Sequence, residues 1–199
     1  LNKYLVKEFK KRNIWVASST HAGEEKFCSQ THIELKKRIK NLTTIIIPRH
    51  IHRVDQIVSE IKNLNLKVDL HSSKKSRLNL TDIYIVDTFG DTQDFHKIAS
   101  SVFLGGSMIK RGGQNPLEAA RFGAKILHGP NIDNFKDIYK KLKSLKISVR
   151  VTTPKKLASS IVFEKNKYMG DKIKNIGTKI FKKTIKELDS IINNELKKT

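Results

Sequence analysis

Short apolar runs recur along most of the chain, and between them lie stretches in which apolar residues return every three or four positions. The runs are rich in β-branched and aromatic residues and are bounded by turn formers, which is typical of β-strands. The stretches between them have the period of amphipathic helices. Seven strands are predicted, at 14–19, 43–48, 66–71, 82–87, 101–106, 124–129 and 147–151.

The apolar character of these strands is nearly continuous and does not alternate between two faces. Strands that are buried on both faces of a parallel sheet have this character. Because helical patterns separate most of the strands, we predict an open, doubly wound, Rossmann-like α/β fold. The predicted helices span 24–40, 52–63, 91–99, 115–122 and 133–145, with a further one from about residue 154.

The end of the chain has a helical pattern of its own. Ile and Leu recur at helical spacing from Asp171 to Leu196, which predicts one long amphipathic helix with Gly177 as its weak point. We therefore expect a domain at 1–165 followed by a helical tail at 166–199. Most such helices cover a domain, and contact of the tail with a membrane or a partner is the alternative.

Charge narrows the classes of partner. The 40 Lys and Arg residues against 19 Asp and Glu give a net charge of +21. This charge would attract nucleic acid, an anionic membrane surface or a phosphorylated substrate, and a compositional bias toward Lys explains it equally well. The single cysteine, Cys28, fits a reducing, cytosolic compartment. No apolar run is long enough to cross a membrane, so we expect a soluble segment, and a start at Leu1 suggests part of a longer protein.

Polar and glycine-rich segments follow five of the predicted strands directly. Ligands of open α/β sheets bind outside the carboxyl ends of the strands. We therefore expect these segments to converge on one edge of the sheet and to form a binding site there. They lie at 18–21, 48–50, 87–91, 105–107 and 129–130.

The segment 105–120 combines four glycines with two cations ahead of a predicted helix. Asn115 has the place of an N-cap, Pro116 that of the first helical residue, and Glu118 lies three residues after the cap, as in a capping box. Capping explains Glu118 but not the glycines, which allow a ligand to approach the backbone closely. Together with the amides of a helix start, they predict a site for a phosphate-bearing ligand. The residues concerned are Gly105, Gly106, Lys110, Arg111, Gly112 and Gly113.

Three other strand ends carry candidate ligand contacts. Arg49 can present a planar fork to a phosphate or a carboxylate, and pairing with a nearby carboxylate of the chain is the alternative. Asp91 could cap the following helix or accept a hydrogen bond from a sugar hydroxyl. Ser19 and Thr20 offer hydroxyls before a long helix, a pattern that capping alone also explains.

The motifs of several other functional classes are missing from the sequence. His50 and His52 form an i, i+2 pair without an acidic cluster, so neither a metal nor another cofactor is predicted. There is no G-x-S-x-G, P-loop or G-x-G-x-x-G motif, which disfavours hydrolases, NTPases and dehydrogenases. Aromatic residues make up 7% of the chain and form no stacking platform on a predicted strand, so nucleic acid is not an expected partner.

Five segments together carry a more specific signal: WVASSTHAGEE (15–25), IIIPRH (45–50), VDTFGD (86–91), FLGGSMIKRGGQNPLEAA (103–120) and HGPNIDNF (128–135). In order and spacing they resemble the C-terminal domain of bacterial 3-deoxy-D-manno-octulosonic acid (Kdo) transferases, over about residues 10–165. The resemblance implies one half of a glycosyltransferase-B fold, which binds the donor CMP-Kdo. In that family the amino-terminal half carries the membrane anchor, the acceptor site for a lipid A precursor and the acidic general base.

Carried over by position, the resemblance implies that 1–165 is a donor-binding domain without a catalytic residue of its own. Arg49 and the amides near Gly105, Gly106 and the helix start would hold the phosphate, and Glu118 would accept hydrogen bonds from the ribose. Lys110 and Arg111 would face the Kdo carboxylate or the departing CMP. The implied CMP contacts are Pro48, Arg49, Phe89, Gly90, Asp91, Asn115, Pro116, Leu117 and Glu118. The secondary candidates are Ser19, Thr20, His50, Gly105, Gly106, Ser107, Lys110, Arg111, Gly112 and Gly113.

Four positions depart from the family pattern. Where the family commonly has D-T-M-G-E, this chain has Phe89 in place of Met and Asp91 in place of Glu. Gln114 stands where the family often has His, and Ala22 stands where Glu is common. A related sugar-nucleotide enzyme with another donor therefore stays an alternative, as does a basic nucleic-acid-binding module.

The resemblance also implies a full-length protein at the cytoplasmic face of the bacterial inner membrane, in contact with its anionic surface. This chain, lacking the amino-terminal half, would bind the donor without transferring it. The sequence makes no prediction of an oligomeric state.

Overall fold

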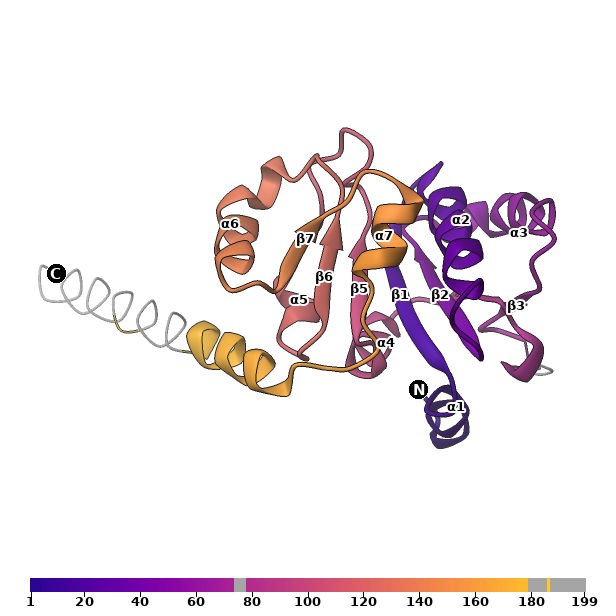
Figure 1. The fold of residues 1–199 in the computed structure, drawn as a ribbon, viewed down its shortest axis with the longest axis horizontal. Helices are drawn as coiled ribbons and strands as arrows, with labels where there is room; N and C mark the ends of the chain where they lie inside the picture. The colour runs from indigo at the N-terminus through magenta and orange to yellow at the C-terminus, as the bar shows by residue number, and fades with distance from the viewer. Residues whose placement is uncertain (74–77, 179–185, 187–199) are drawn as a thin grey trace, which may run out of the picture.

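The computed structural model describes residues 1–73, 78–178 and 186. Seven strands form one sheet in the order β3-β4-β2-β1-β5-β6-β7, and every neighbouring pair is parallel. The predicted doubly wound α/β fold is confirmed. In Figure 1 the carboxyl ends of the strands point to the top of the view. The strands are β1 (Asn13–Thr20), β2 (Leu42–Pro48), β3 (Val68–Leu70), β4 (Ile83–Ile85), β5 (Ser101–Leu104), β6 (Lys125–His128) and β7 (Ser148–Arg150).

Helices cover both faces of this sheet (Figure 1). Helices α2, α3 and α7 pack on one face, and α1, α4, α5, α6 and the helical residues 167–178 pack on the other. Helix α1 was not predicted, and α5 is shorter than the predicted 115–122 because the chain turns at Gly123, where φ is +79°. The helices are α1 (Lys3–Phe9), α2 (Glu24–Lys36), α3 (Val54–Lys62), α4 (Thr92–Ile98), α5 (Leu117–Ala120), α6 (Lys136–Ser144) and α7 (Pro154–Ser160), with 3-10 turns η1 (Ile51–Arg53), η2 (Leu78–Leu80) and η3 (Asp133–Phe135).

The central strand β1 supplies both hydrophobic cores. Val16 points to the core under α4, α5 and α6, whereas Trp15 and Ala17 point to the core under α2, α3 and α7. All three side chains are fully buried. Full burial of a large apolar side chain contributes about 1.5–3 kcal/mol, so the nearly continuous apolar runs reflect two covered faces.

The order of the strands reverses at β1. Strand β2 pairs with one side of β1 and β5 with the other. At such a switch point the connecting chains leave in opposite directions and open a crevice beyond the carboxyl ends. Strand β1 is irregular at this end, because its register with β2 shifts between Ser18 and Thr20 and Ser19 has a φ of +55°. The topology thus brings the segments after β1, β2 and β5 together.

The last described helix returns to the face that holds α5 and α6. Asn166 caps it, since its side-chain oxygen accepts a hydrogen bond from the Met169 amide at 3.0 Å. Ile173 is buried against the core, whereas Ile176 is exposed. Within the described residues, no helix has both the length and the apolar character that a membrane span requires. The remainder of the predicted tail helix, 179–185 and 187–196, lies outside the described residues.

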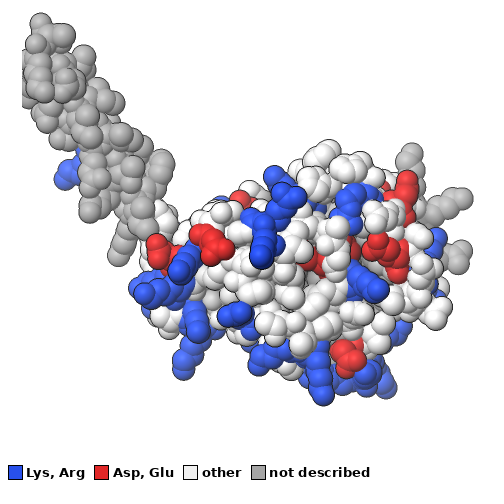
Figure 2. Space-filling view, turned by 90° about the horizontal axis from the view of Figure 1, so that it is seen from above, with Lys and Arg blue, Asp and Glu red and all other residues white. Residues whose placement is uncertain are grey.

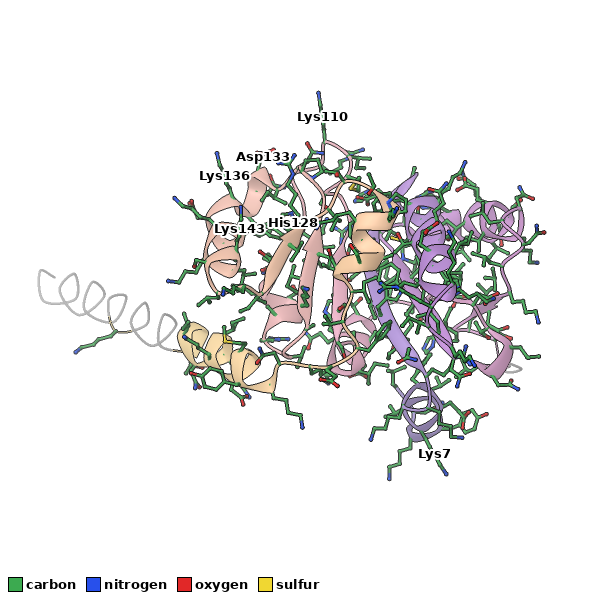
Figure 3. The ribbon with its side chains drawn as sticks, in the orientation of Figure 1. Lys7, Lys110, His128, Asp133, Lys136 and Lys143 are labelled. Carbon is green, nitrogen blue, oxygen red and sulfur yellow. The ribbon has the colours of Figure 1, made fainter. Side chains whose placement is uncertain are left out.

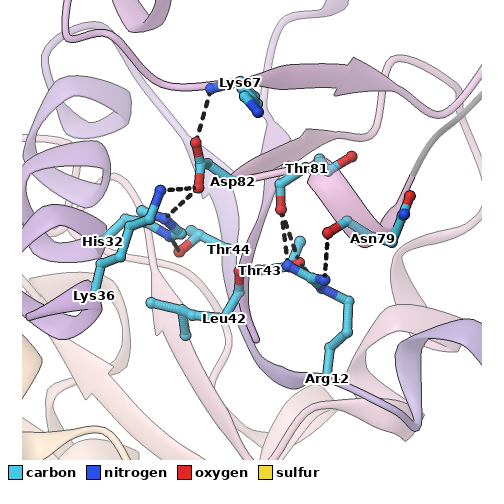
Figure 4. Close-up of polar contacts among 10 residues, drawn as sticks. All are labelled: Arg12, His32, Lys36, Leu42, Thr43, Thr44, Lys67, Asn79, Thr81 and Asp82. Atoms are coloured by element: carbon cyan, nitrogen blue, oxygen red, sulfur yellow. Dashed lines mark hydrogen bonds and ion pairs between the residues drawn. The ribbon is translucent and has the colours of Figure 1, made fainter. Parts of the chain in front are cut away.

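A polar cluster closes the opposite, amino edge of the sheet (Figure 4). The Asp82 carboxylate accepts hydrogen bonds from Lys36 Nζ at 2.6 Å and from the Lys67 amide at 3.0 Å, and it lies 3.4 Å from His32 Nε2. Burial alone would raise the pKa of Asp82. The hydrogen bonds from His32, Lys36 and the Lys67 amide outweigh burial and hold the pKa well below its ordinary value.

We predict that Asp82→Asn lowers the free energy of unfolding by roughly 1–3 kcal/mol at neutral pH, because hydrogen bonds to a charged acceptor are lost. Since the folded-state pKa is lowered, the carboxylate stabilises the fold above its unfolded-state pKa of about 3.9, and this contribution fades as the pH falls below that value. Urea denaturation of both proteins at pH 7 and pH 3 measures the effect. The difference in midpoint should shrink at pH 3, and the exposed Asp133→Asn should leave the midpoint unchanged at both.

Candidate binding site at the carboxyl edge

A buried carboxylate organises the centre of the carboxyl edge. Glu24, in the first turn of α2, accepts hydrogen bonds from the amides of Gly106 at 2.7 Å, Ser107 at 3.1 Å and Met108 at 2.9 Å. It also accepts one from the His21 amide at 3.0 Å. The residue is 1% exposed. Backbone donors therefore compensate its charge, and they join the segment after β1 to the segment after β5.

Two of the amides that were predicted to hold a phosphate have partners inside the chain. The Gly106 amide donates to Glu24, and the Gly105 amide donates to the Ser18 carbonyl at 2.8 Å. A Cβ at Gly105 would lie 2.2 Å from the Ser19 carbonyl oxygen. This glycine is therefore required by the close approach of β1 and β5, and side chains rather than these amides face outward at the rim.

The segment after β6 clamps the glycine-rich loop from the outer side. Asn131 Nδ2 donates to the carbonyls of Ser107 and Met108, both at 3.2 Å. Gly112 has a φ of +77°, and a Cβ there would lie 2.5 Å from the Asn134 side chain. The loop is thus held on two sides, and Lys110 projects outward from its tip (Figure 3).

Basic side chains gather along this rim. The Arg49 amide donates a hydrogen bond to the Thr20 carbonyl, at the end of β1, at 2.9 Å. Arg49 itself is exposed. The rings of His21 and His50 meet edge to face at 5.6 Å. Burial first, and then the charges of His50, Arg111 and Arg49, lower the pKa of His21. Figure 2, which looks onto this edge, shows lysines and arginines spread over it with aspartates and glutamates between them. The rim is suited to an anionic ligand.

The predicted contacts Phe89, Gly90 and Asp91 lie in a separate cluster beside β3 and β4. Phe89 is 86% exposed. Asp91 accepts a hydrogen bond from Thr88 Oγ1 at 2.6 Å and lies 3.6 Å from His71 Nε2, and its side chain does not cap α4. Among the described residues, no hydrogen bond or ion pair connects this cluster to the basic rim.

The predicted contacts Asn115–Glu118 stand at the start of α5. Pro116 and not Asn115 occupies the N-cap position, and the Asn115 side chain accepts a hydrogen bond from the Leu117 amide at 3.0 Å. The predicted capping box does not form, since no hydrogen bond joins Glu118 to the Asn115 backbone. Glu118 instead lines a groove of about 480 Å³ between α5, α6 and the helical residues 167–178. Apolar walls of this groove come from Ile138, Leu142, Leu145 and Ile173.

Known proteins resemble the chain in sequence, although no family model matches it. A 3-deoxy-D-manno-octulosonic acid transferase from Rickettsia felis is 33% identical over 152 residues, which are 76% of this chain and 32% of the relative. A protein of the same name from Haemophilus influenzae is 30% identical over 131 residues, 66% of this chain and 31% of the relative. This chain is a relative of the Kdo transferases.

A solved structure shares the fold of this chain. The C-terminal CMP-Kdo binding domain of WaaA from Acinetobacter baumannii superposes with a TM-score of 0.71 over 79% of this chain and 84% of that chain, at 24% identity. The resemblance found in the sequence is confirmed, and so is the fold that it implies. The chain spans about a third of the length of the curated Kdo transferases that it matches.

We predict that Glu24→Gln lowers the free energy of unfolding by about 2 kcal/mol or more, because the Gln NH2 group would face amide donors that need an acceptor. Urea denaturation measures this loss. Hydrogen exchange should also become faster at the amides of Gly106, Ser107 and Met108. Glu60→Gln, whose carboxylate accepts from the exposed Gln56 side chain, is the control. Equal midpoints for the two variants would contradict a central role of the Glu24 carboxylate.

Proposed function

We propose that this chain is the donor-binding part of a Kdo transferase and that it binds CMP-Kdo at the carboxyl edge of its sheet. The observation that carries the proposal is a basic rim at the switch point of a doubly wound sheet, in a chain related to Kdo transferases. Open α/β sheets bind nucleotides at this position. The +21 charge then serves the capture of an anionic donor.

Side chains of the rim would bind the phosphate. The exposed Arg49 can present two parallel N–H donors to phosphate oxygens, which a Lys cannot match. Lys110 and Arg111, on the clamped loop, would stabilise the negative charge that develops on the departing CMP. Glu118 has no hydrogen-bond partner among the described residues, so its carboxylate is free to accept from ribose hydroxyls. The contacts proposed for Phe89, Gly90 and Asp91 rest on the resemblance alone.

The remaining steps of the reaction belong to parts of a longer protein. Because the chain spans about a third of its curated relatives, we place the lipid A precursor site and the general base outside it. The chain by itself would then bind the donor and transfer nothing. The full-length protein would act at the cytoplasmic face of the inner membrane, where basic surfaces of this chain can contact anionic lipid headgroups.

Titration with CMP, UMP and a DNA oligonucleotide at two salt concentrations tests the proposal. We expect CMP to bind more tightly than UMP, because the donor carries cytidylate. A preference for UMP would point to another sugar nucleotide. Salt-sensitive binding of the oligonucleotide, without a preference between the nucleotides, would instead favour a nucleic-acid-binding module.

We predict that Arg49→Ala weakens CMP binding by about 10- to 100-fold, because a hydrogen bond to a charged group contributes roughly 1.5–3 kcal/mol. Isothermal titration calorimetry gives the two dissociation constants. The control is Arg150→Ala, which removes an exposed cation at the end of β7, on the same edge of the sheet. A similar loss of CMP affinity in both variants would mean that Arg49 acts only through its positive charge and does not contact the phosphate.

A further inference from the structure

Two consecutive residues at the carboxyl end of β1 carry buried polar atoms without a hydrogen-bond partner among the described residues. They are Thr20 Oγ1 and His21 Nε2. Buried polar atoms in native proteins are nearly always hydrogen-bonded, to the protein, to water or to a ligand. Thr20 was a secondary candidate in the sequence, whereas His21 lay in the predicted segment 18–21 without being named as a ligand contact. The pair therefore marks a place where a group from outside the chain completes the bonding.

The position of His21 is set by the same carboxylate that holds the glycine-rich loop. Its amide donates to Glu24 at 3.0 Å, and its carbonyl accepts from the Glu24 amide at 2.9 Å. A Cβ at Gly106 would lie 3.5 Å from the His21 ring and 3.4 Å from both the Arg111 and Gln114 side chains. These are ordinary contact distances, so they place the His21 ring beside Arg111 and Gln114, and it is the φ of +65° that favours a glycine at residue 106.

The charges that face His21 are mostly positive. His50 and Arg49 lie at the end of β2, Arg111 lies in the loop after β5, and Glu25 of α2 is the opposing acid. The Glu25 carboxylate is already paired with Arg53, whose Nη1 lies 3.1 Å from Oε1. The Glu24 carboxylate is occupied by four amides. An anion that enters here would thus meet an uncompensated cluster of basic groups around an imidazole.

We propose that His21 is a further ligand-contacting residue, whose Nε2 forms a hydrogen bond to a phosphate oxygen of the cytidylate and takes up a proton from solvent on binding. This inference rests on the proposed function. Burial first, and then the surrounding cations, lower the pKa of this imidazole in the free protein and so disfavour its protonated form. A bound phosphate places an opposite charge beside the ring and raises that pKa. The contribution of His21 to binding therefore grows as the pH falls, and it adds uptake of up to one proton per ligand.

The test compares CMP binding to the wild-type chain, His21→Ala, His21→Gln and His52→Gln between about pH 5.5 and pH 8. Calorimetry in two buffers of different ionisation enthalpy gives the affinity and the number of protons taken up. CMP itself titrates near about pH 6, and this contribution is common to all four proteins. His52 is an exposed histidine whose ring lies tilted against that of His50, with the centroids 5.5 Å apart, so its replacement is the matched control.

We expect His21→Ala to weaken CMP binding by about 10-fold or more, since it loses a hydrogen bond to a charged group. In His21→Gln a side-chain amide can still donate to phosphate, so part of the affinity should return while the proton uptake linked to residue 21 does not. The His52→Gln control should keep both the affinity and the uptake of the wild type. Thermal unfolding of each variant separates loss of binding from loss of fold.

Two results would overturn the inference in different ways. If the wild type binds CMP while both His21 variants match its affinity and proton uptake, His21 is not a contact and the proposed function stands. If the wild type does not bind CMP, the proposed function fails together with the role of His21.

Discussion

The carboxyl edge of this fold depends on the compensation of one buried charge. A carboxylate that is 1% exposed is tolerated only where donors surround it, and Glu24 has four of them, all backbone amides. Three belong to the loop after β5 and one to the segment after β1. Two loops that the topology merely brings near each other are thereby fixed to one another. These four hydrogen bonds fix the backbone that carries His21 and the backbone that leads to the basic residues after Gly106.

The arrangement of the sheet could be predicted because its cause is local. Each strand of a sheet that is covered on both faces carries its own apolar run, and all seven runs fold as strands. Helix α1 escaped the prediction because its seven residues are mixed in polarity, and only Phe9 is fully buried. Helix α5 was predicted too long, because the turn at Gly123 depends on its packing against Asn166, a contact between distant parts of the chain.

The candidate site was predicted less completely, for a related reason. Residues that directly follow strands, such as Arg49, lie where the topology rule placed them. Glu24 did not stand out, because an acid in the first turn of a helix also stabilises the helix dipole, and three of its four partners lie more than 80 positions away. The glycines suggested room for a ligand, yet Gly105 serves the approach of its own chain to Ser19. A glycine-rich pattern indicates a close approach to the backbone, but it does not tell whether a ligand or another segment of the chain makes that approach.

The clamping of the glycine-rich loop by Glu24 and Asn131 has a consequence for kinetics. A loop that is already held loses its conformational entropy during folding and not at the moment of encounter. No slow ordering step then has to precede capture of a ligand at this edge. Association would be set by diffusion and by the long-range field of the cations, so its rate would fall as ionic strength rises. Differences in affinity between related ligands would lie chiefly in how long each one stays bound.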